Sequence, residues 1–105
     1  GHMVALQRED NSGILRAEIA TGKAYGALGF GISSRTLGAN NTDRPAFLAA
    51  ASAAADGKLV PVAGGVLIRN SDGHVIGAVG VSGDNSDNDE IAAIAGIETA
   101  GLTAA

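Results

Sequence analysis

Apolar residues recur at helical spacing over a long stretch of the N-terminal half. From Gly13 to about Phe30 they return every three or four positions and form two neighbouring stripes, one of them made mostly of alanine. An apolar surface this wide predicts a helix that contacts other elements on two sides. Asn11 and Ser12 are residue types that favour a helix N-cap, so the helix should begin directly after them.

Two shorter helical signals follow this first helix. The residues from Ser33 to Gly38 fit a single helical turn. Proline is favoured in the first turn of a helix, and the apolar run after Pro45 predicts a helix that continues to Ala55, with Thr42 or Asp43 as its cap.

Strand-like segments alternate with turn residues in other parts of the chain. Pro61 restricts its segment to an edge or an irregular position, because proline has no N–H to donate. The sequence from Asn70 to Gly73 is typical of a turn, and it joins two of the segments into a hairpin. The segments expected to be extended are Val4–Arg8, Leu59–Val62, Val66–Arg69 and Val75–Ser82.

The second hairpin strand carries a glycine at every third position, at Gly77, Gly80 and Gly83. Glycine inside a strand gives up side-chain packing, so it marks a bulge or a close approach of another backbone, a helix or a ligand. These glycines fall on alternating faces of the strand. We therefore expect close approach on both sides of the sheet.

The chain ends in a further helical pattern. This helix is expected from about Asp87 to Gly101, with Ser86 and Asp89 in the positions of a capping box. Helices and antiparallel strands in this order predict the α+β class, an antiparallel sheet packed against helices. At 105 residues, the chain is expected to form a single domain over residues 1–105.

Composition narrows the classes of function. The net charge of −4 argues against nucleic acid and against a membrane surface as partners, since basic patches bind both. The chain has no cysteine, which excludes disulfides, thiolate metal sites and cysteine nucleophiles. No apolar run reaches the roughly 20 residues of a membrane span, and no signal peptide is visible. We expect a cytoplasmic protein, although a mature secreted form would have the same composition.

The glycine-rich hairpin resembles that of a known family. The run from Gly64 to Gly83, GGVLIRNSDGHVIGAVGVSG, is similar to the hairpin of the GlcG/HbpS-like family, also called haem-degrading proteins, which includes the C-terminal domain of the PduO proteins. Val4–Arg8 is similar to the family's second strand, and Ile19–Ala24 to its following helix with a central lysine. Leu67 stands where the family usually has proline. The resemblance implies a profilin-like layout.

The resemblance also bears on the N-terminus. Members of the family begin with a helix and a first strand, whereas this chain starts at about the second strand. We therefore expect the chain to be truncated, its N-terminal elements having been cut away, deleted or supplied by another chain. Gly1-His2-Met3 fits a cloning remnant, and it equally fits the native residues that often precede Val-Ala in the family.

Lys23 is the first candidate for ligand binding. Arg16 and Lys23 are seven residues apart, so both side chains lie on one face of the expected helix, beside small residues such as Ala20. A carboxylate or phosphate would be held well there. The alternative is that both side chains reach solvent or pair with acidic residues. The resemblance supports Lys23 alone, because lysine at that place is typical of the family.

The ends of the hairpin strands and the start of the last helix supply further candidates. Backbone amides at strand ends can bind an anion, although tight turn geometry would also explain the glycines there. Asp89 and Glu90 match the family motif, and we expect one of them to face the sheet and its pocket. The expected ligand-binding residues are Lys23, Gly64, Gly65, Ser82, Gly83, Asp89 and Glu90.

Metal and haem ligands are scarce in the sequence. The acidic residues from Asp84 to Glu90 are explained by capping of a helix and lack the glycine and glutamate of a calcium loop, so we expect no metal site; a surface divalent site is the weaker alternative. His74 follows the hairpin turn, where a histidine is normally exposed. The family's haem-binding members are thought to use N-terminal residues. This chain lacks that region, so we expect weak or absent haem binding, with any residual affinity coming from Lys23 or Arg16 pairing with the propionates.

Three functions remain open. We favour a small-ligand or cofactor-binding protein, with haem as the cofactor that the resemblance implies in some members. One alternative is an oligomeric structural domain without catalysis. The other is an accessory protein of glycolate, diol or cobalamin metabolism, which only the family's associations suggest. No catalytic residue can be named, because no Ser, His and Asp arrangement has the context of a hydrolase.

A homo-oligomer is expected under each of these functions. A chain this small buries only about two-thirds of its unfolded surface. A sheet without its first strand would also expose an unpaired edge and apolar helix faces to water. The expected contact surfaces are the first helix and an exposed edge of the sheet.

Overall fold

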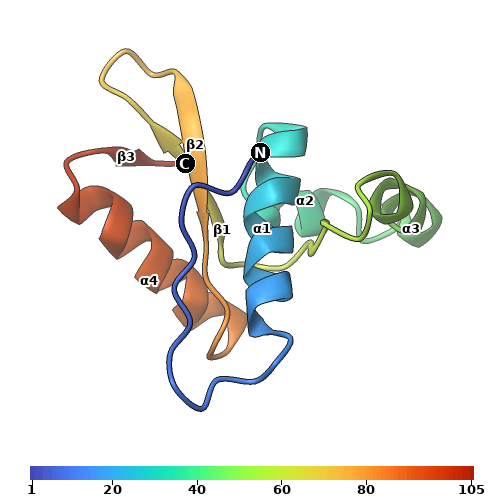
Figure 1. Ribbon diagram of the computed structural model, residues 1–105. Helices are drawn as coiled ribbons and strands as arrows, with labels where there is room; N and C mark the ends of the chain where they lie inside the picture. Colours follow the sequence, from blue (N-terminus) through green and yellow to red (C-terminus); the bar gives the residue numbers. More distant parts are fainter.

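A computed structural model describes residues 1–105 as four helices and a three-stranded antiparallel sheet (Figure 1). The strands lie in the order β2-β1-β3 and are β1 (Gly65–Arg69), β2 (Val75–Gly80) and β3 (Thr103–Ala104). The helices are α1 (Arg16–Phe30), α2 (Ser34–Asn40), α3 (Pro45–Ala54) and α4 (Ser86–Thr99). The expected α+β class, an antiparallel sheet packed against helices, is confirmed.

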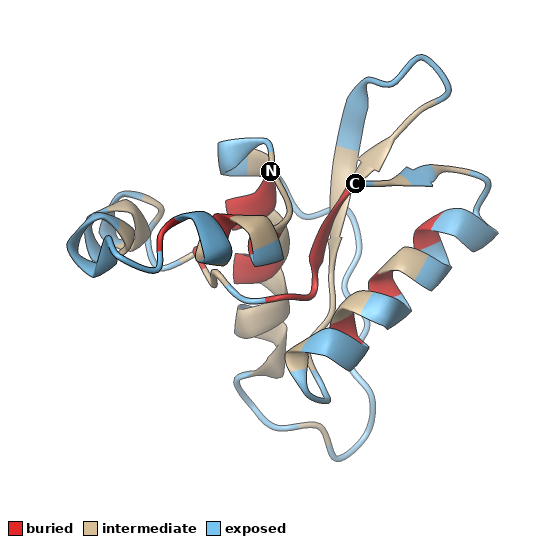
Figure 2. Cartoon of the chain, turned by 180° about the vertical axis from the view of Figure 1, so that it is seen from behind, coloured by how far each residue is buried: buried red, intermediate tan, exposed pale blue.

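The helices α1 and α4 cover opposite sides of the sheet (Figure 1). Val66 in β1 packs with Ala93 and Ile97 of α4 in a small apolar cluster. The next residue, Leu67, points to the other face, because side chains alternate along a strand. Both residues are buried, and Figure 2 shows the burial along β1. The centre of the fold is therefore β1, enclosed between two helices.

Close approach of α1 to the sheet depends on one of the three periodic glycines. A side chain at Gly80 would collide with the backbone carbonyl of Ala20 in α1. A methyl group at Gly77 would meet its nearest atom, in Ile68, at an ordinary 3.7 Å, and at Gly83 it would meet nothing within 4 Å. The expectation of close approach is confirmed at Gly80 and wrong for the other two positions.

The hairpin between β1 and β2 forms at the predicted turn. The Oδ1 atom of Asn70 accepts hydrogen bonds from the backbone N–H groups of Asp72 and His74, at 3.1 and 2.9 Å. Gly73 has a φ of +82°, which a side chain would disfavour. The strand β2 ends at Gly80, two residues before the predicted end at Ser82.

Two segments predicted to be strands are not strands. Val4–Arg8 has no regular secondary structure and no strand partner, and Val4 (99% exposed) and Leu6 (52%) remain exposed. A strand needs a neighbour for its backbone hydrogen bonds, and this segment has none. Leu59–Val62 docks on α1 instead of the sheet, since the N–H of Val60 donates to the carbonyl of Gly22. The strand β3 was not predicted, because two residues carry no periodic signal.

The first helix begins later than predicted. It starts at Arg16 with Leu15 in the N-cap position, and neither Asn11 nor Ser12 caps it. Asn11 has a φ of +66°, so the chain turns there instead of entering the helix.

The caps of the later helices also differ from the prediction. Arg44, not Thr42 or Asp43, precedes α3, whose first residue is a proline without an N–H to cap. Asn85 caps α4 by accepting from the N–H of Asn88, so Ser86 is the first helical residue and not the cap. The single turn predicted at residues 33–38 is the seven-residue helix α2, capped by the Ser33 side chain.

Candidate ligand-binding groove

Lys23 and Asp89 form a buried ion pair between α1 and α4. Their side chains are 2% and 3% exposed, and the Lys23 Nζ and Asp89 Oδ2 atoms are 3.0 Å apart. The Lys23 ammonium also donates to the carbonyl of Val81, at 3.0 Å. Lys23 therefore joins α1 to α4 and to the segment that follows β2. Of the two alternatives for this lysine, pairing with an acidic residue is the one realised, although the pair lies in the interior.

Asp89 also holds the segment that follows β2. Its Oδ1 atom accepts hydrogen bonds from the backbone N–H groups of Gly83 and Asp84, at 3.1 and 2.9 Å. With Lys23 on its other oxygen, the carboxylate has three partners. Such complete satisfaction is what a buried charge requires. The amide of Gly83, predicted to bind an anion, is thus already bonded to the protein's own carboxylate.

Gly64 and Gly65 let the hairpin approach Lys23. A side chain at Gly64 would lie within 3 Å of the Lys23 side chain, and one at Gly65 would collide with the Lys23 backbone. The N–H of Gly65 donates to the hydroxyl of Ser34, at 2.7 Å. These glycines serve close approach to α1 and α2, and neither lies at an open surface.

Glu90 points away from this interior cluster. Its carboxylate accepts a hydrogen bond from Arg35 in α2, at 2.9 Å, and Arg35 also pairs with Asp87. Hydrogen bonds to Asp87 and then to Glu90 raise the pKa of Arg35 further above its ordinary value. Of the two acidic residues in the family motif, Asp89 is the one that faces the sheet.

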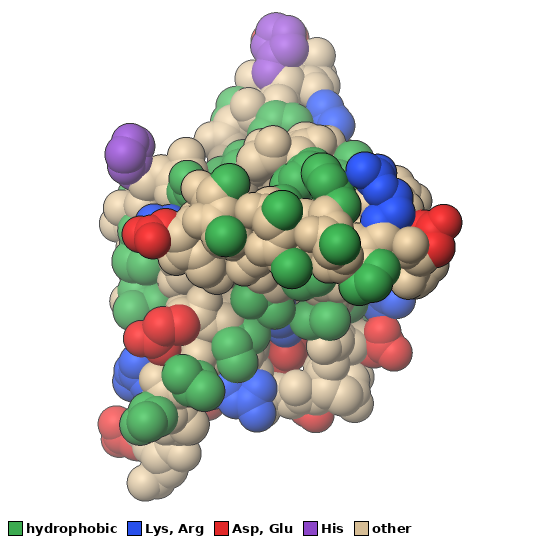
Figure 3. Space-filling view, turned by 90° about the vertical axis from the view of Figure 1, so that its right-hand side faces the viewer, with side chains coloured by type: hydrophobic (Ala, Val, Ile, Leu, Met, Phe, Trp, Pro, Cys, Tyr) green, Lys and Arg blue, Asp and Glu red, His purple; other side chains and the backbone are tan.

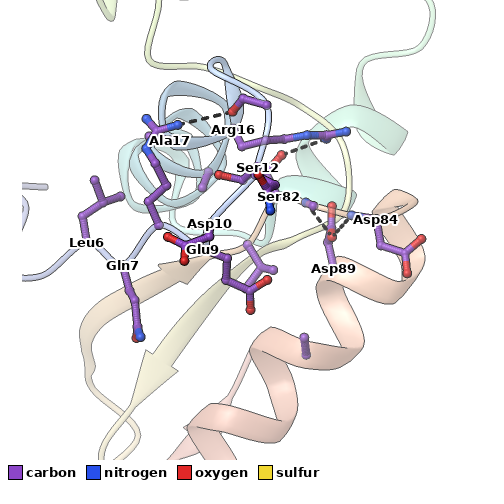
Figure 4. Close-up of a pocket in the computed structure, with 18 of the residues that line it drawn as sticks. Leu6, Gln7, Glu9, Asp10, Ser12, Arg16, Ala17, Ser82, Asp84 and Asp89 are labelled. Carbon is purple, nitrogen blue, oxygen red and sulfur yellow. Dashed lines mark hydrogen bonds between the residues drawn. The ribbon is translucent and has the colours of Figure 1, made fainter.

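A polar cavity lies beside Asp89, between the N-terminal segment, α1 and the end of β2. Its volume is about 680 Å³, and Figure 4 shows that residues from all these parts point toward it. Arg16 reaches across it from α1 and donates from Nη1 to the hydroxyl of Ser82, at 3.2 Å. Three of the seven predicted ligand-binding residues line this cavity, namely Ser82, Gly83 and Asp89.

An apolar cavity of about 540 Å³ continues the polar one. Ala5, Leu6, Ala20 and Gly80 line both, so the two cavities form one groove along the N-terminal segment. Hydrophobic residues make up 12 of the 17 that line the apolar end, which lies between α1 and β2. The side chains with metal-ligating atoms at this end are His2, Met3 and Tyr25.

The groove contains two arginines without carboxylate partners. Arg16 bonds to a serine hydroxyl, and Arg8 donates to the carbonyl of Gly13, at 3.3 Å. Among the basic residues of the chain, only Lys23 and Arg35 form ion pairs with carboxylates. Acidic residues outnumber the arginines in the polar cavity, since Glu9, Asp10, Asp84 and Asp89 line it as well. An anionic group on a bound molecule would therefore have to lie against the guanidinium groups, neither of which pairs with a carboxylate.

Sequence reasoning missed the N-terminal wall of this groove. Arg8 and its neighbours were assigned to a strand of the sheet, and the apolar end was not anticipated at all. The signal that was present is Arg16, whose helical spacing from Lys23 placed it on the same face of α1. His74 lies at the exposed hairpin and lines neither cavity, as predicted.

No three His, Asp or Glu side chains are grouped so as to hold a metal ion. None of the helices combines the length and the apolar character that crossing a bilayer requires.

Comparisons with known proteins agree with this architecture. A family model described as "Haem degrading protein HbpS-like" matches residues 1–98. Among solved structures, the chain is similar to one described as "Crystal Structure of PduOC:Heme Complex", with a TM-score of 0.73 and 24% sequence identity. The match covers 94% of this chain and 69% of that chain, and it is a likeness of fold. No curated protein matches.

Proposed function

Because the chain belongs to the HbpS-like family of haem-degrading proteins, as its hairpin residues predicted, we propose that it binds haem in the groove beside α1. The observation that supports this most is the division of the groove into an apolar end and an end with unpaired arginines. Haem has the matching division, with an apolar macrocycle and two carboxylates at one edge.

The residues at each end of the groove suit the corresponding part of haem. Arg16, and Arg8 with it, would pair with the propionates, since guanidinium and carboxylate form strong charge-assisted hydrogen bonds. Histidine, methionine and tyrosine are the usual uncharged or phenolic ligands of haem iron, and all three types line the apolar end. Tyr25 is the one supplied by a helix. Bound haem would bring a redox-active iron to this site.

Lys23 and Asp89 take part indirectly in this proposal. Their ion pair holds the segment from Val81 to Asp84, which forms one wall of the polar end. Both are positioning residues for the groove, and Asp89 also lines its polar end. We expect modest affinity, because the outer wall is the N-terminal segment, which has no regular secondary structure.

A haem titration followed by the Soret band tests the proposal. Arg16→Gln should weaken binding about 10-fold, the effect of one partly exposed charge-assisted hydrogen bond. Arg69→Gln removes the same charge from a hairpin residue that does not line the groove, and it should leave the affinity unchanged. Tyr25→Phe should shift the ligand-sensitive bands if Tyr25 binds the iron, whereas His74→Ala should have no effect.

Haem dimethyl ester provides a second control, since it lacks the propionate charges. The Arg16→Gln variant should bind the ester as well as the unaltered protein does. No binding of haem, equal affinity of Arg16→Gln and Arg69→Gln for it, or a complex lost in His74→Ala would contradict the proposed site.

A further inference from the structure

The helix α3 stands apart from the rest of the molecule. It projects to the right in Figure 1, and no other helix or strand packs along it. None of its residues is buried, although nine of the ten in PAFLAAASAA are apolar. A helix that is apolar on all sides is normally buried, and one this short is marginal in water by itself. Apart from the contact of Phe47 with Phe30 of α1, the helix therefore lacks a partner.

Larger apolar side chains extend this surface at the N-terminal end of α3. The rings of Phe30 and Phe47 meet edge to face at 6.1 Å, and both remain exposed, at 41% and 36%. Figure 3, which looks onto this side of the molecule, shows apolar side chains spread over its front. We call this the α3 surface, and its members are Phe30, Phe47, Ala46, Ala49, Ala50 and Ala53.

The accessible area of the chain exceeds that of a compact monomer of its size. It is 6350 Å². A compact monomer of 10.3 kDa exposes about 5,400 Å², so this chain exposes roughly 1,000 Å² more. A stable dimer removes about 800 Å² from each partner. The N-terminal segment shares this surplus, but it carries charged residues, whereas α3 carries none.

The α3 surface is also complementary to itself. When two copies of the helix pack antiparallel about a two-fold axis, Ala46 lies opposite Ala53 and Ala49 opposite Ala50, so that small side chains meet along the whole contact. Arg44 precedes the helix and Asp56 follows it. The antiparallel arrangement brings these opposite charges together at both ends.

From these observations we propose that α3 is the interface of a two-fold symmetric homodimer, in which two α3 helices pack antiparallel through their alanine faces. The partner is a second copy of this chain. The interface lies on the opposite side of α1 from the sheet. Of the contact surfaces that the sequence suggested, it includes Phe30 of the first helix and no edge of the sheet.

Sedimentation of the full chain at micromolar concentration tests the interface. The unaltered protein should have twice the monomer mass of 10.3 kDa. Ala50→Glu places two like charges at the two-fold axis and should reduce self-association at least 100-fold. Ala95→Glu makes the same change at an exposed position of α4, and it should leave the dimer intact. A monomeric wild type, or a dimer that persists in Ala50→Glu, overturns the proposal.

Disulfide cross-linking tests the antiparallel arrangement. Because the chain has no cysteine of its own, only an introduced cysteine can form the cross-link. Oxidised Ala50→Cys should form a covalent dimer across the axis. Ala46→Cys alone should not, since about 10 Å along the helix separates the two copies of this residue. A mixture of Ala46→Cys and Ala53→Cys should cross-link. Cross-linking of Ala46→Cys with itself would show parallel packing and overturn the proposed geometry.

Discussion

Gly80 is the residue whose replacement the fold should tolerate least. Its Cα faces the backbone carbonyl of Ala20, so a branched side chain would push α1 away from the sheet. Overpacking of this kind costs about 1–3 kcal/mol, and here the obstacle is backbone that cannot rotate aside. We expect Gly80→Val to lower the free energy of unfolding by more than about 2 kcal/mol, measured by urea denaturation.

Two other glycines serve as controls for this prediction. Gly77→Ala meets only an ordinary contact at 3.7 Å and should change the urea midpoint little. Gly73→Ala should have an intermediate effect of about 1 kcal/mol, because its cost is the positive φ of +82° alone. Equal midpoints for Gly80→Val and Gly77→Ala would show that the approach of α1 does not limit this position.

The Lys23–Asp89 pair should behave as a structural unit. Removal of one partner leaves the other charge buried, so Lys23→Met and Asp89→Leu should each lower the free energy of unfolding by about 3 kcal/mol or more. The double variant should lose less than the sum of the two, because it leaves no unpaired charge. A double-mutant cycle in urea measures this coupling. Unchanged stability in Lys23→Met would instead indicate that Lys23 serves ligand binding and not the stability of the fold.

The residues of the site were partly predictable from the sequence. The motif residues Lys23 and Asp89 were both selected, but the sequence does not show that they pair with each other, because 66 positions separate them along the chain. Glu90 was selected with Asp89, and only the fold shows that it faces Arg35. Arg8 could not be found, since its place in the groove depends on the path of a segment without regular structure.

At the scale of elements, the sequence located helices well and their ends less well. The apolar spacing that identifies α1, α3 and α4 is a local property of the sequence, so these helices can be predicted without knowing the fold. The choice of cap depends on the backbone direction at one residue, as the positive φ of Asn11 shows. Strand assignment failed at Val4–Arg8 because a strand exists only when a neighbour pairs with it, and pairing is not local.

The start of α4 offers a test at this scale. Asn85 accepts a hydrogen bond from the N–H of Asn88 at 2.9 Å, so Asn85→Ala should lower the free energy of unfolding by about 1 kcal/mol. Ser86→Ala should be nearly neutral, because Ser86 is the first residue of the helix. Thermal or urea unfolding distinguishes the two. The reverse order of effects would place the cap at Ser86, as the capping-box pattern predicted.

At the scale of the whole molecule, the fold buries few residues and leaves many large apolar side chains exposed. Only 16 of 105 residues are buried, and the exposed large hydrophobic residues include several in the N-terminal segment. The groove lies along that segment, and the α3 surface lies on a different part of the molecule. A ligand and a second subunit would therefore cover separate surfaces, and both would contribute to the stability of the folded chain.

This separation predicts how stability depends on concentration. A dimer is favoured by mass action, so a hundredfold increase in protein concentration should raise the melting temperature by several degrees. Haem should raise it further in Ala50→Glu as in the unaltered protein, because the groove does not include α3. In Ala50→Glu without haem, the melting temperature should be independent of protein concentration. A concentration dependence that survives in this variant would mean that the subunits meet elsewhere, and the first helix and the sheet edge would then be the surfaces to test.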